Sequence, residues 1–172
     1  GFQFEIIPAN IEEETAFRNV DPSEHVCDLA MQKAEFIAKH RSEPAIILGS
    51  DTIVLLKGEI LNKPVDKKDA VRMLKKLSGK THVVYTGIAL VEVPGNRSVS
   101  TCQRTNVKFR KLSEEEIIAY VATGSPMDKA GAYGIQDDFG AIFIENIEGC
   151  YYNIVGLPLE LLYTTLKKFI RN

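Results

Sequence analysis

Two spacings of apolar residues run through the 172-residue chain and separate its predicted helices from its predicted strands. Apolar residues three or four positions apart predict helices at 21–40, 66–78, 113–124 and 157–170. Apolar runs and alternation predict strands at 2–7, 45–48, 53–56, 59–61, 82–93, 99–109, 141–147 and 151–155. Helices interspersed with strands predict an α/β fold, with a mixed, twisted sheet flanked by helices. Since no linker or repeat divides the chain, residues 1–172 are expected to form one domain.

Capping residues indicate where three of these helices begin. Asp21, with Glu24 three residues later, fits the N-cap of a capping box. Asp66 fits the N-cap of the second helix, and Ser113, again with a glutamate three residues later, fits another capping box. Such side chains accept hydrogen bonds from the backbone N–H groups that the first helical turn leaves without partners.

Asp51 and Thr52 follow the apolar strand at 45–48, which we predict to be buried and to end at residues 49–50. In open α/β sheets, ligands bind beyond the carboxyl ends of strands. A carboxylate at that place, beside a hydroxyl, can hold a metal ion or take a proton. The alternative is that Asp51 only caps a turn.

A predicted hairpin follows Asp51. Strands at 53–56 and 59–61 flank a turn at 57–58, and the chain then reaches Lys63, which Pro64 follows. A hairpin of this kind can return Lys63 to the neighbourhood of Asp51. A carboxylate and a lysine in one cleft would suit chemistry on a phosphate group.

Lys33 lies on the apolar face of the helix predicted at 21–40, between Leu29 and Phe36. A lysine on an inward face is unusual, because burying an unpaired ammonium group is costly. Two interpretations stay open: the side chain reaches water at the edge of the helix, or it enters a polar cleft and meets an anion.

Two further segments are candidates for ligand contacts. Three glutamates at 12–14 fit a solvated surface, or one of them turns inward to help hold a cation. The glycine-containing segment 126–136 can bring free backbone N–H groups close to an anion, and Lys129 within it favours phosphate binding. A plain turn is the alternative for this second segment.

The composition excludes several classes of protein. With 45% hydrophobic and 26% charged residues and a formal net charge of −2, nothing favours nucleic acid or an anionic membrane as a partner. The apolar runs are too short to span a bilayer. Cysteines and histidines have neither zinc spacing nor a disulfide pattern, which predicts a structural or exposed role for each histidine and a cytoplasmic protein.

Five ordered motifs resemble those of the Maf family of nucleoside triphosphate pyrophosphatases. They are GSDTIV (49–54), GEILNKP (58–64), MLKKLSGKTHVVYTG (73–87), MDKAGAYGIQ (127–136) and YNIVGLPL (152–159). Their order and spacing agree with the family over essentially the whole chain. The form of the 127–136 motif resembles the branch that acts on dTTP and UTP.

The resemblance implies a fold and a reaction. The family form is an elongated domain related to the inosine triphosphate pyrophosphatases, with two lobes around a cleft, and commonly a homodimer. Its members hydrolyse a nucleoside triphosphate between the α and β phosphates, to the monophosphate and pyrophosphate, with a divalent cation, Mg²⁺ or Mn²⁺. The implied cellular role is nucleotide-pool cleaning or restraint of division.

The resemblance also implies roles for single residues. Asp51 corresponds to the family's proton acceptor, and Glu13 to its second acidic residue, so both are expected to contact the metal. Lys33 and Lys63 match lysines that would neutralise the triphosphate. A smaller set matches positions linked to base selection: Thr52 and Gln136. Gln136 can donate and accept hydrogen bonds, which suits the edge of thymine or uracil.

The chain departs from the family pattern in two places. Asn62 stands where the family often has a glycine. The family's first strand and its serine- and arginine-rich loop should lie before Gly1, and we expect this sequence to lack both. This second departure keeps a rival hypothesis open, a nucleotide-binding protein without turnover that acts in division control. A pyrophosphatase for another altered base, such as inosine triphosphate, is a more remote alternative.

Overall fold

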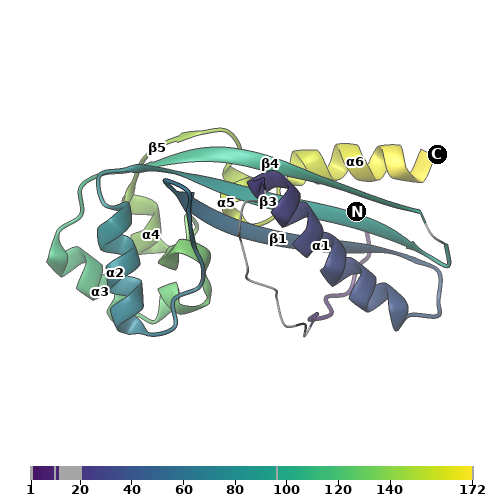
Figure 1. The fold of residues 1–172 in the computed structure, drawn as a ribbon, viewed down its shortest axis with the longest axis horizontal. Helices are drawn as coiled ribbons and strands as arrows, with labels where there is room; N and C mark the ends of the chain where they lie inside the picture. Colours follow the sequence, from purple (N-terminus) through teal and green to yellow (C-terminus); the bar gives the residue numbers. More distant parts are fainter. Residues whose placement is uncertain (1, 10, 12–20, 96, 172) are drawn as a thin grey trace.

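The structure is a computed structural model that describes residues 2–9, 11, 21–95 and 97–171. Its centre is a five-stranded sheet in the order β2-β1-β3-β4-β5 (Figure 1). The strands are β1 (Ala45–Leu56), β2 (Glu59–Leu61), β3 (Thr81–Val93), β4 (Ser98–Phe109) and β5 (Ile144–Glu148). The four pairings between these strands are all antiparallel, so the described residues contain no parallel pair of a mixed sheet.

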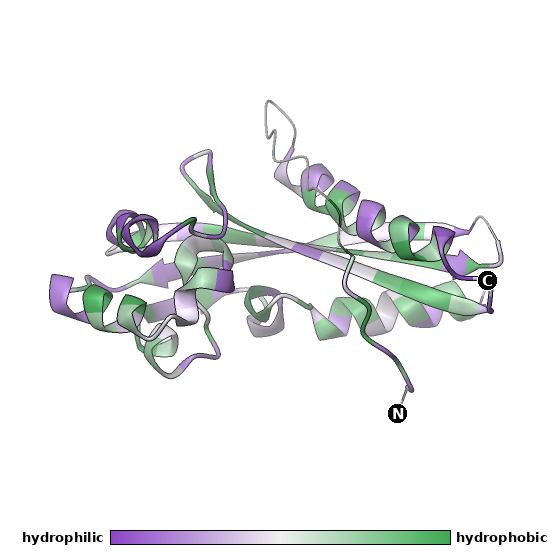
Figure 2. Ribbon diagram, turned by 90° about the horizontal axis from the view of Figure 1, so that it is seen from below, coloured by the Kyte–Doolittle hydropathy of each residue, from purple (hydrophilic) through white to green (hydrophobic). Residues whose placement is uncertain are grey.

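Helices cover this sheet in two groups, which makes the molecule elongated with two lobes. The helices are α1 (Pro22–Lys39), α2 (Lys67–Leu77), α3 (Glu114–Ala122), α4 (Asp138–Ile142), α5 (Tyr151–Val155) and α6 (Leu159–Arg171), with the 3-10 turns η1 (Ser125–Asp128) and η2 (Ala130–Ala132). Figure 2 shows the twist of the sheet, with α1 and α6 on opposite faces at one end, while α2, α3 and α4 gather at the other end. The predicted α/β class, with a twisted sheet flanked by helices, is confirmed.

The predicted helix starts are also confirmed. Asp21 accepts a hydrogen bond from the backbone of Ser23, and Asp66 accepts one from the backbone of Asp69. Ser113 and Glu116 form the complete capping box of α3. The apolar stripe of α2 is buried and joins the main core: Ala70, Met73, Leu74 and Leu77.

The strand predicted at 2–7 is wrong. Residues 2–9 have no regular secondary structure, and the apolar side chains of Phe2, Phe4 and Ile6 are 68%, 83% and 85% exposed. Alternation of apolar and polar residues produces a strand only where the backbone finds a neighbouring strand. None of the described strands pairs with this segment.

The prediction for the first strand of the sheet needs two corrections. β1 does not end at residues 49–50 but continues to Leu56, because β3 pairs with it from Ala45 to Leu55. Its first residues are not buried either, since Ile46 and Leu48 are 37% and 40% exposed.

Two predictions near the carboxyl end of the chain were inaccurate. The strand expected at 141–147 begins later, as β5, after the short helix α4. The segment 151–155 is the helix α5 and not a strand, although aromatic and branched residues favour strands. The amide of Asn153 donates to the carbonyl of Val84 (3.1 Å) and to Thr105 Oγ1 (2.9 Å), and Gly156, with φ of +113°, ends the helix.

Two of the excluded classes can be checked against the described residues. None of their helices has both the length and the apolar character needed to cross a membrane. No three or more His, Cys, Asp or Glu side chains gather there into a set that could hold a metal ion, and the three cysteines form no disulfide.

His82 is a buried structural histidine, in agreement with the prediction. It is 1% exposed, and its Nε2 shares a hydrogen bond of 2.8 Å with the hydroxyl of Tyr133. Burial lowers the pKa of His82 from 6.5 to about 3. Below pH 6.5 the unfolded chain therefore takes up a proton at this histidine that the folded chain does not take up.

We expect this difference to weaken the fold as the pH falls. The stabilising contribution of His82 to the free energy of unfolding is complete above pH 6.5. Below that pH, about 1.4 kcal/mol of it is lost for each pH unit. In urea unfolding at several pH values, the wild type should lose stability faster than His82→Gln, so the gap between their free energies of unfolding narrows. Two parallel curves between about pH 6 and pH 4.5 would contradict the assignment.

Candidate active site

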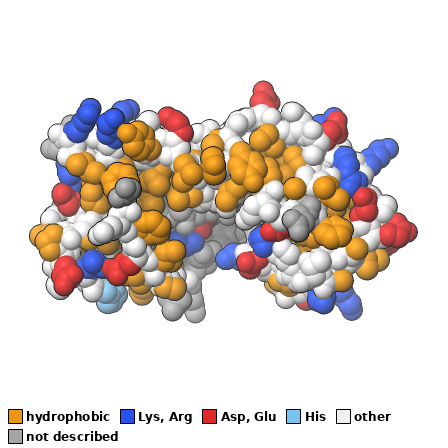
Figure 3. All heavy atoms as spheres, turned by 180° about the vertical axis from the view of Figure 1, so that it is seen from behind, with side chains coloured by type: hydrophobic (Ala, Val, Ile, Leu, Met, Phe, Trp, Pro, Cys, Tyr) orange, Lys and Arg blue, Asp and Glu red, His pale blue; other side chains and the backbone are white. Residues whose placement is uncertain are grey.

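A polar pocket lies where the two lobes meet, and five of the predicted site residues line it. These are Asp51, Thr52, Lys63, Lys129 and Gln136. Figure 3 shows the molecule hollowed between its lobes, with acidic and basic side chains at the edge of the hollow. Residues from β1, β3, α5 and the segment 125–136 complete the wall. Glu13, the second predicted acidic residue, lies outside the described residues.

Lys33 reaches this site because α1 packs directly on the backbone of the sheet. A Cβ atom at Gly49 would lie 2.1 Å from the carbonyl oxygen of Ala30, and one at Gly87 would lie 2.2 Å from that of Val26. Only residues without a side chain permit such an approach. The close packing of α1 against β1 brings Lys33 over Asp51.

Lys33 and Asp51 form an ion pair between Nζ and Oδ1. Their side chains are only 20% and 10% exposed. Of the two interpretations of Lys33, the structure has the second, in which the ammonium group meets an anion, and that anion is Asp51. A largely buried carboxylate held by a lysine suits a residue whose orientation matters for chemistry.

Asp51 lies in the middle of β1, and this corrects how its position was predicted. It pairs with Gly87 of β3, so it lies neither beyond a strand end nor at the cap of a turn. The rule for parallel sheets, that ligands bind beyond strand ends, does not apply to this antiparallel strand. Among the described strands, residues 45–53 of β1 pair only with β3, and Ser50, Asp51 and Thr52 of this stretch line the pocket.

Neighbours of Asp51 along β1 point to the other face of the sheet, as alternation requires. Ser50 Oγ lies 3.0 Å from the carbonyl oxygen of Gly156, and Thr52 Oγ1 lies 2.9 Å from Thr86 Oγ1. Thr86 in turn donates to the carbonyl of Asn153 (2.8 Å). These contacts fix α5 and the turn after it against the middle of β1, where they form one wall of the pocket.

The predicted hairpin brings Lys63 to the same pocket. β1 and β2 pair from Val54–Leu61 to Leu56–Glu59, around a turn in which Lys57 and Gly58 have φ of 52° and 84°. The carbonyl of Asn62, next to Lys63, accepts a hydrogen bond of 3.2 Å from the N–H of Gly131. The hairpin is therefore connected to the glycine-containing segment opposite it.

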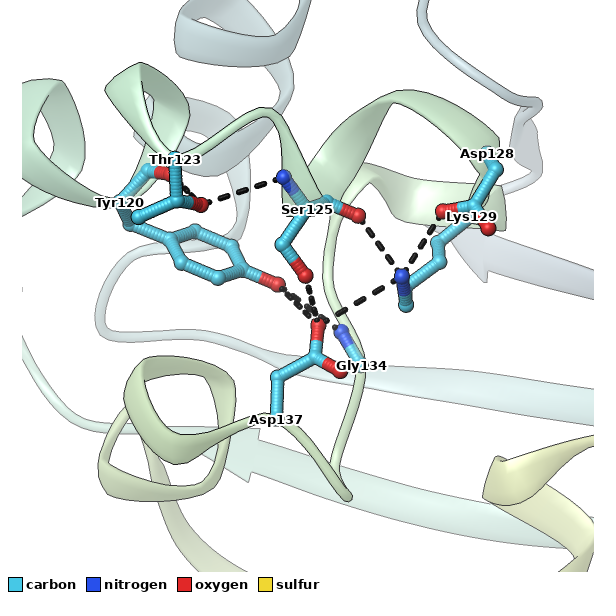
Figure 4. A network of polar contacts seen from close by, with 7 residues as sticks. All are labelled: Tyr120, Thr123, Ser125, Asp128, Lys129, Gly134 and Asp137. Carbon is cyan, nitrogen blue, oxygen red and sulfur yellow. Dashed lines mark hydrogen bonds and ion pairs between the residues drawn. The ribbon is translucent and has the colours of Figure 1, made fainter.

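Lys129 is held within its own loop (Figure 4). Its Nζ donates to the carbonyl of Ser125 and to Asp128 Oδ1, both at 2.7 Å, and lies 3.6 Å from Asp137 Oδ2. The loop is folded tightly, with left-handed backbone at Gly131 and Ala132 (φ of 70° and 60°). The segment is therefore a structured loop along the pocket and not a plain turn, which was the alternative in the sequence analysis.

Sequence reasoning missed several residues that shape the pocket. Ser50, Thr86 and Asn153 fix one wall, and Asp137 organises the loop with Lys129. The sequence does hold one signal for Asn153, an amide inside the otherwise apolar and aromatic run 151–155, where a buried polar group needs partners. Nothing in the sequence around Asp137 indicates its contacts, because its partners Tyr120 and Ser125 lie 17 and 12 residues earlier in the chain.

The described residues can contribute to a divalent cation site. Mg²⁺ is commonly held by one or two carboxylates together with water and substrate phosphates, so a protein site needs few ligands of its own. Asp51 and Asp128 are the carboxylates among the described residues that line the pocket. Oxygen donors of this kind suit Mg²⁺ or Mn²⁺.

Comparison with known proteins places the chain in a family. The family model described as Maf-like protein matches residues 1–169. The chain belongs to the Maf family. The curated relatives include three proteins, each named dTTP/UTP pyrophosphatase. One from Dictyoglomus turgidum is 47% identical over 98% of this chain and 86% of its own length. One from Clostridium perfringens SM101 is 44% identical over 97% of this chain and 86% of its own length. One from Clostridium novyi NT is 49% identical over 93% of this chain and 83% of its own length.

The approach of α1 to the sheet in this Maf protein can be tested by adding one methyl group. Gly49→Ala should lower the free energy of unfolding in urea by about 1–3 kcal/mol or more, because the new Cβ overlaps the backbone of α1. It should also separate Lys33 from Asp51. Ser98→Thr, which adds a methyl group at an exposed position of β4, is the control and should change stability little. Unchanged stability of Gly49→Ala would contradict the packing described.

Proposed function

We propose that this Maf family chain hydrolyses nucleoside triphosphates, dTTP and UTP among them, to the monophosphate and pyrophosphate. The observation that carries the proposal is the convergence of Asp51, Lys63 and Lys129 on one pocket, with Lys33 paired to Asp51. The names of the relatives support the same activity and do not favour the rival hypothesis of a binding protein without turnover.

Asp51 is the proposed proton acceptor for the attacking water. Its contact with Lys33 orients the carboxylate, and Asp51 lines the pocket that would hold the substrate. A carboxylate fixed in this way can take a proton as the water attacks phosphorus. Lys63 and Lys129 are proposed to bind phosphate oxygens and to stabilise the negative charge that develops on them.

A divalent cation, Mg²⁺ or Mn²⁺, is proposed as the cofactor. Asp51 would hold it, together with Glu13, which the family resemblance implies, and with oxygens of the substrate. When bound, the cation supplies positive charge next to the phosphates and lowers the pKa of a coordinated water.

Gln136 and Thr52 are proposed to select the base. Gln136 has an exposed side chain at the wall of the pocket, and its amide can pair with both the carbonyl and the N–H of uracil or thymine. Thr52 already shares a hydrogen bond with Thr86, which fixes its hydroxyl on this wall.

A homodimer in the cytoplasm is the proposed state of the protein. Apolar side chains form a band across the face shown in Figure 3. Exposed apolar residues on α5 and α6 offer a surface for a second copy: Tyr151, Tyr152, Val155, Leu159, Tyr163 and Ile170. A cytoplasmic location fits an enzyme whose substrates are nucleotides.

Replacement of Asp51 tests the proposed reaction. Asp51→Asn keeps the size of the side chain but cannot accept a proton, so release of pyrophosphate from UTP should fall by about a hundredfold or more. Because the change also weakens the ion pair with Lys33, the melting temperature should fall as well, and turnover is measured at a temperature at which the variant is folded. Glu145→Gln, which alters an exposed carboxylate paired with Lys108, is the matched control and should retain full activity. Near-normal turnover of Asp51→Asn would remove this residue from the role of proton acceptor.

Replacement of Gln136 tests base selection. Gln136→Ala should lower the preference for UTP over CTP about tenfold, because the two bases differ in the donors and acceptors that the amide would contact. The preference is measured as the ratio of kcat/KM for the two nucleotides. If the ratio of the variant equals that of the wild type, Gln136 does not read the base.

A further inference from the structure

Asp137 lies at the N-cap of α4 but does not cap it. An aspartate at this position ordinarily accepts a hydrogen bond from an N–H group of the first helical turn. Here the side chain makes no capping hydrogen bond. The carboxylate instead turns back toward the loop that precedes the helix (Figure 4).

One carboxylate oxygen of Asp137 accepts hydrogen bonds from two hydroxyl groups and lies near an ammonium group. Oδ2 accepts hydrogen bonds from Tyr120 Oη (2.9 Å) and Ser125 Oγ (2.6 Å), and it lies 3.6 Å from Lys129 Nζ. The side chain is only 20% exposed. Burial raises the pKa of the Tyr120 hydroxyl, so this group stays protonated and continues to donate.

These contacts join the two ends of the loop that forms one wall of the pocket. Ser125 begins the loop, and Asp137 ends it. Between them, Tyr120 Oη also accepts a hydrogen bond of 3.2 Å from the N–H of Gly134. A Cβ atom at Gly134 would lie 2.7 Å from Asp137 Oδ2, so the carboxylate rests directly on the backbone of the loop.

Gln136 lies between Gly134 and Asp137, the two residues of the loop through which this network holds the backbone. Its own side chain is exposed, and its amide can select a base only if the backbone that carries it is fixed. Without the carboxylate, the ends of the loop would separate, and the hydroxyls of Tyr120 and Ser125 would lose their shared acceptor.

We propose that Asp137 is a positioning residue for base selection: its carboxylate closes the loop 125–137 and thereby holds Gln136 toward the pyrimidine. This inference rests on the proposed function and deepens it. Asp137 itself is not proposed to touch the nucleotide. Its effect is exerted through the backbone of the loop.

The experiment compares two replacements of Asp137 by their preference for UTP over CTP. Asp137→Ala removes the acceptor and should lower the ratio of kcat/KM about tenfold, as far as Gln136→Ala does. Asp137→Asn keeps an oxygen that can accept from both hydroxyls and should retain the preference within about threefold. Both variants lose the negative charge, but only Asp137→Ala loses the oxygen that accepts hydrogen bonds. The comparison therefore separates the effect of hydrogen bonding from the effect of charge.

A double variant shows whether the two residues act together. If Asp137 acts through Gln136, the variant with both residues changed to alanine should discriminate no worse than Gln136→Ala alone. Additive losses would overturn the proposal, and so would an Asp137→Ala variant that keeps the full preference, or an Asp137→Asn variant that loses as much as Asp137→Ala. Glu145→Ala, which removes an exposed carboxylate paired with Lys108, is the control for loss of charge.

Two further comparisons distinguish a failure of this inference from a failure of the proposed function. Ser125→Ala removes only one donor and should lower the preference in the same direction, so it replaces Asp137→Ala if that variant does not fold. A wild type that releases no pyrophosphate would contradict the proposed function. A wild type and Gln136→Ala that behave as predicted, beside an Asp137→Ala variant with unchanged preference, would contradict this inference alone.

Discussion

The direct packing of α1 on the backbones of β1 and β3 is the constraint on which the site depends. Gly49 and Gly87 leave no atom between the helix and the sheet, and this contact brings Lys33 to Asp51. Removing one partner of such a largely buried pair takes an opposite charge away from the other, which is more costly than replacing both. The pairing therefore stabilises α1 and orients the carboxylate at the same time.

The long antiparallel strands connect the two lobes and let distant segments contribute to one pocket. β1 carries Asp51 in its middle, while its far end forms the hairpin that delivers Lys63. On the opposite face, hydrogen bonds through Ser50 and Thr86 hold α5 against the same stretch of sheet. The walls of the pocket are thus set by backbone pairing and buried polar contacts, which suits the recognition of a substrate that carries both charge and a base.

Much of the fold follows from local patterns, and the exceptions have physical reasons. The stripe of α2 and the capping box of α3 depend on neighbours within a few residues, so the sequence predicts them well. The course of β1 past Gly49 and the helix at 151–155 depend on partners far along the chain, namely β3 and the acceptors of Asn153. The family motifs contain Asp51, Lys63 and Gln136, whereas the role of Asp137 in the loop is visible only once Tyr120 and Ser125 are seen beside it.

The identity of the phosphorus products tests the proposed chemistry most directly. Phosphorus NMR of UTP incubated with the wild-type chain and Mg²⁺ distinguishes the bond that is cleaved. Hydrolysis of the bond between the α and β phosphates gives uridine monophosphate and pyrophosphate in equal amounts. Asp51→Asn should give neither product above background. Formation of uridine diphosphate and orthophosphate, or equal amounts of product from Asp51→Asn, would contradict a pyrophosphatase whose proton acceptor is Asp51.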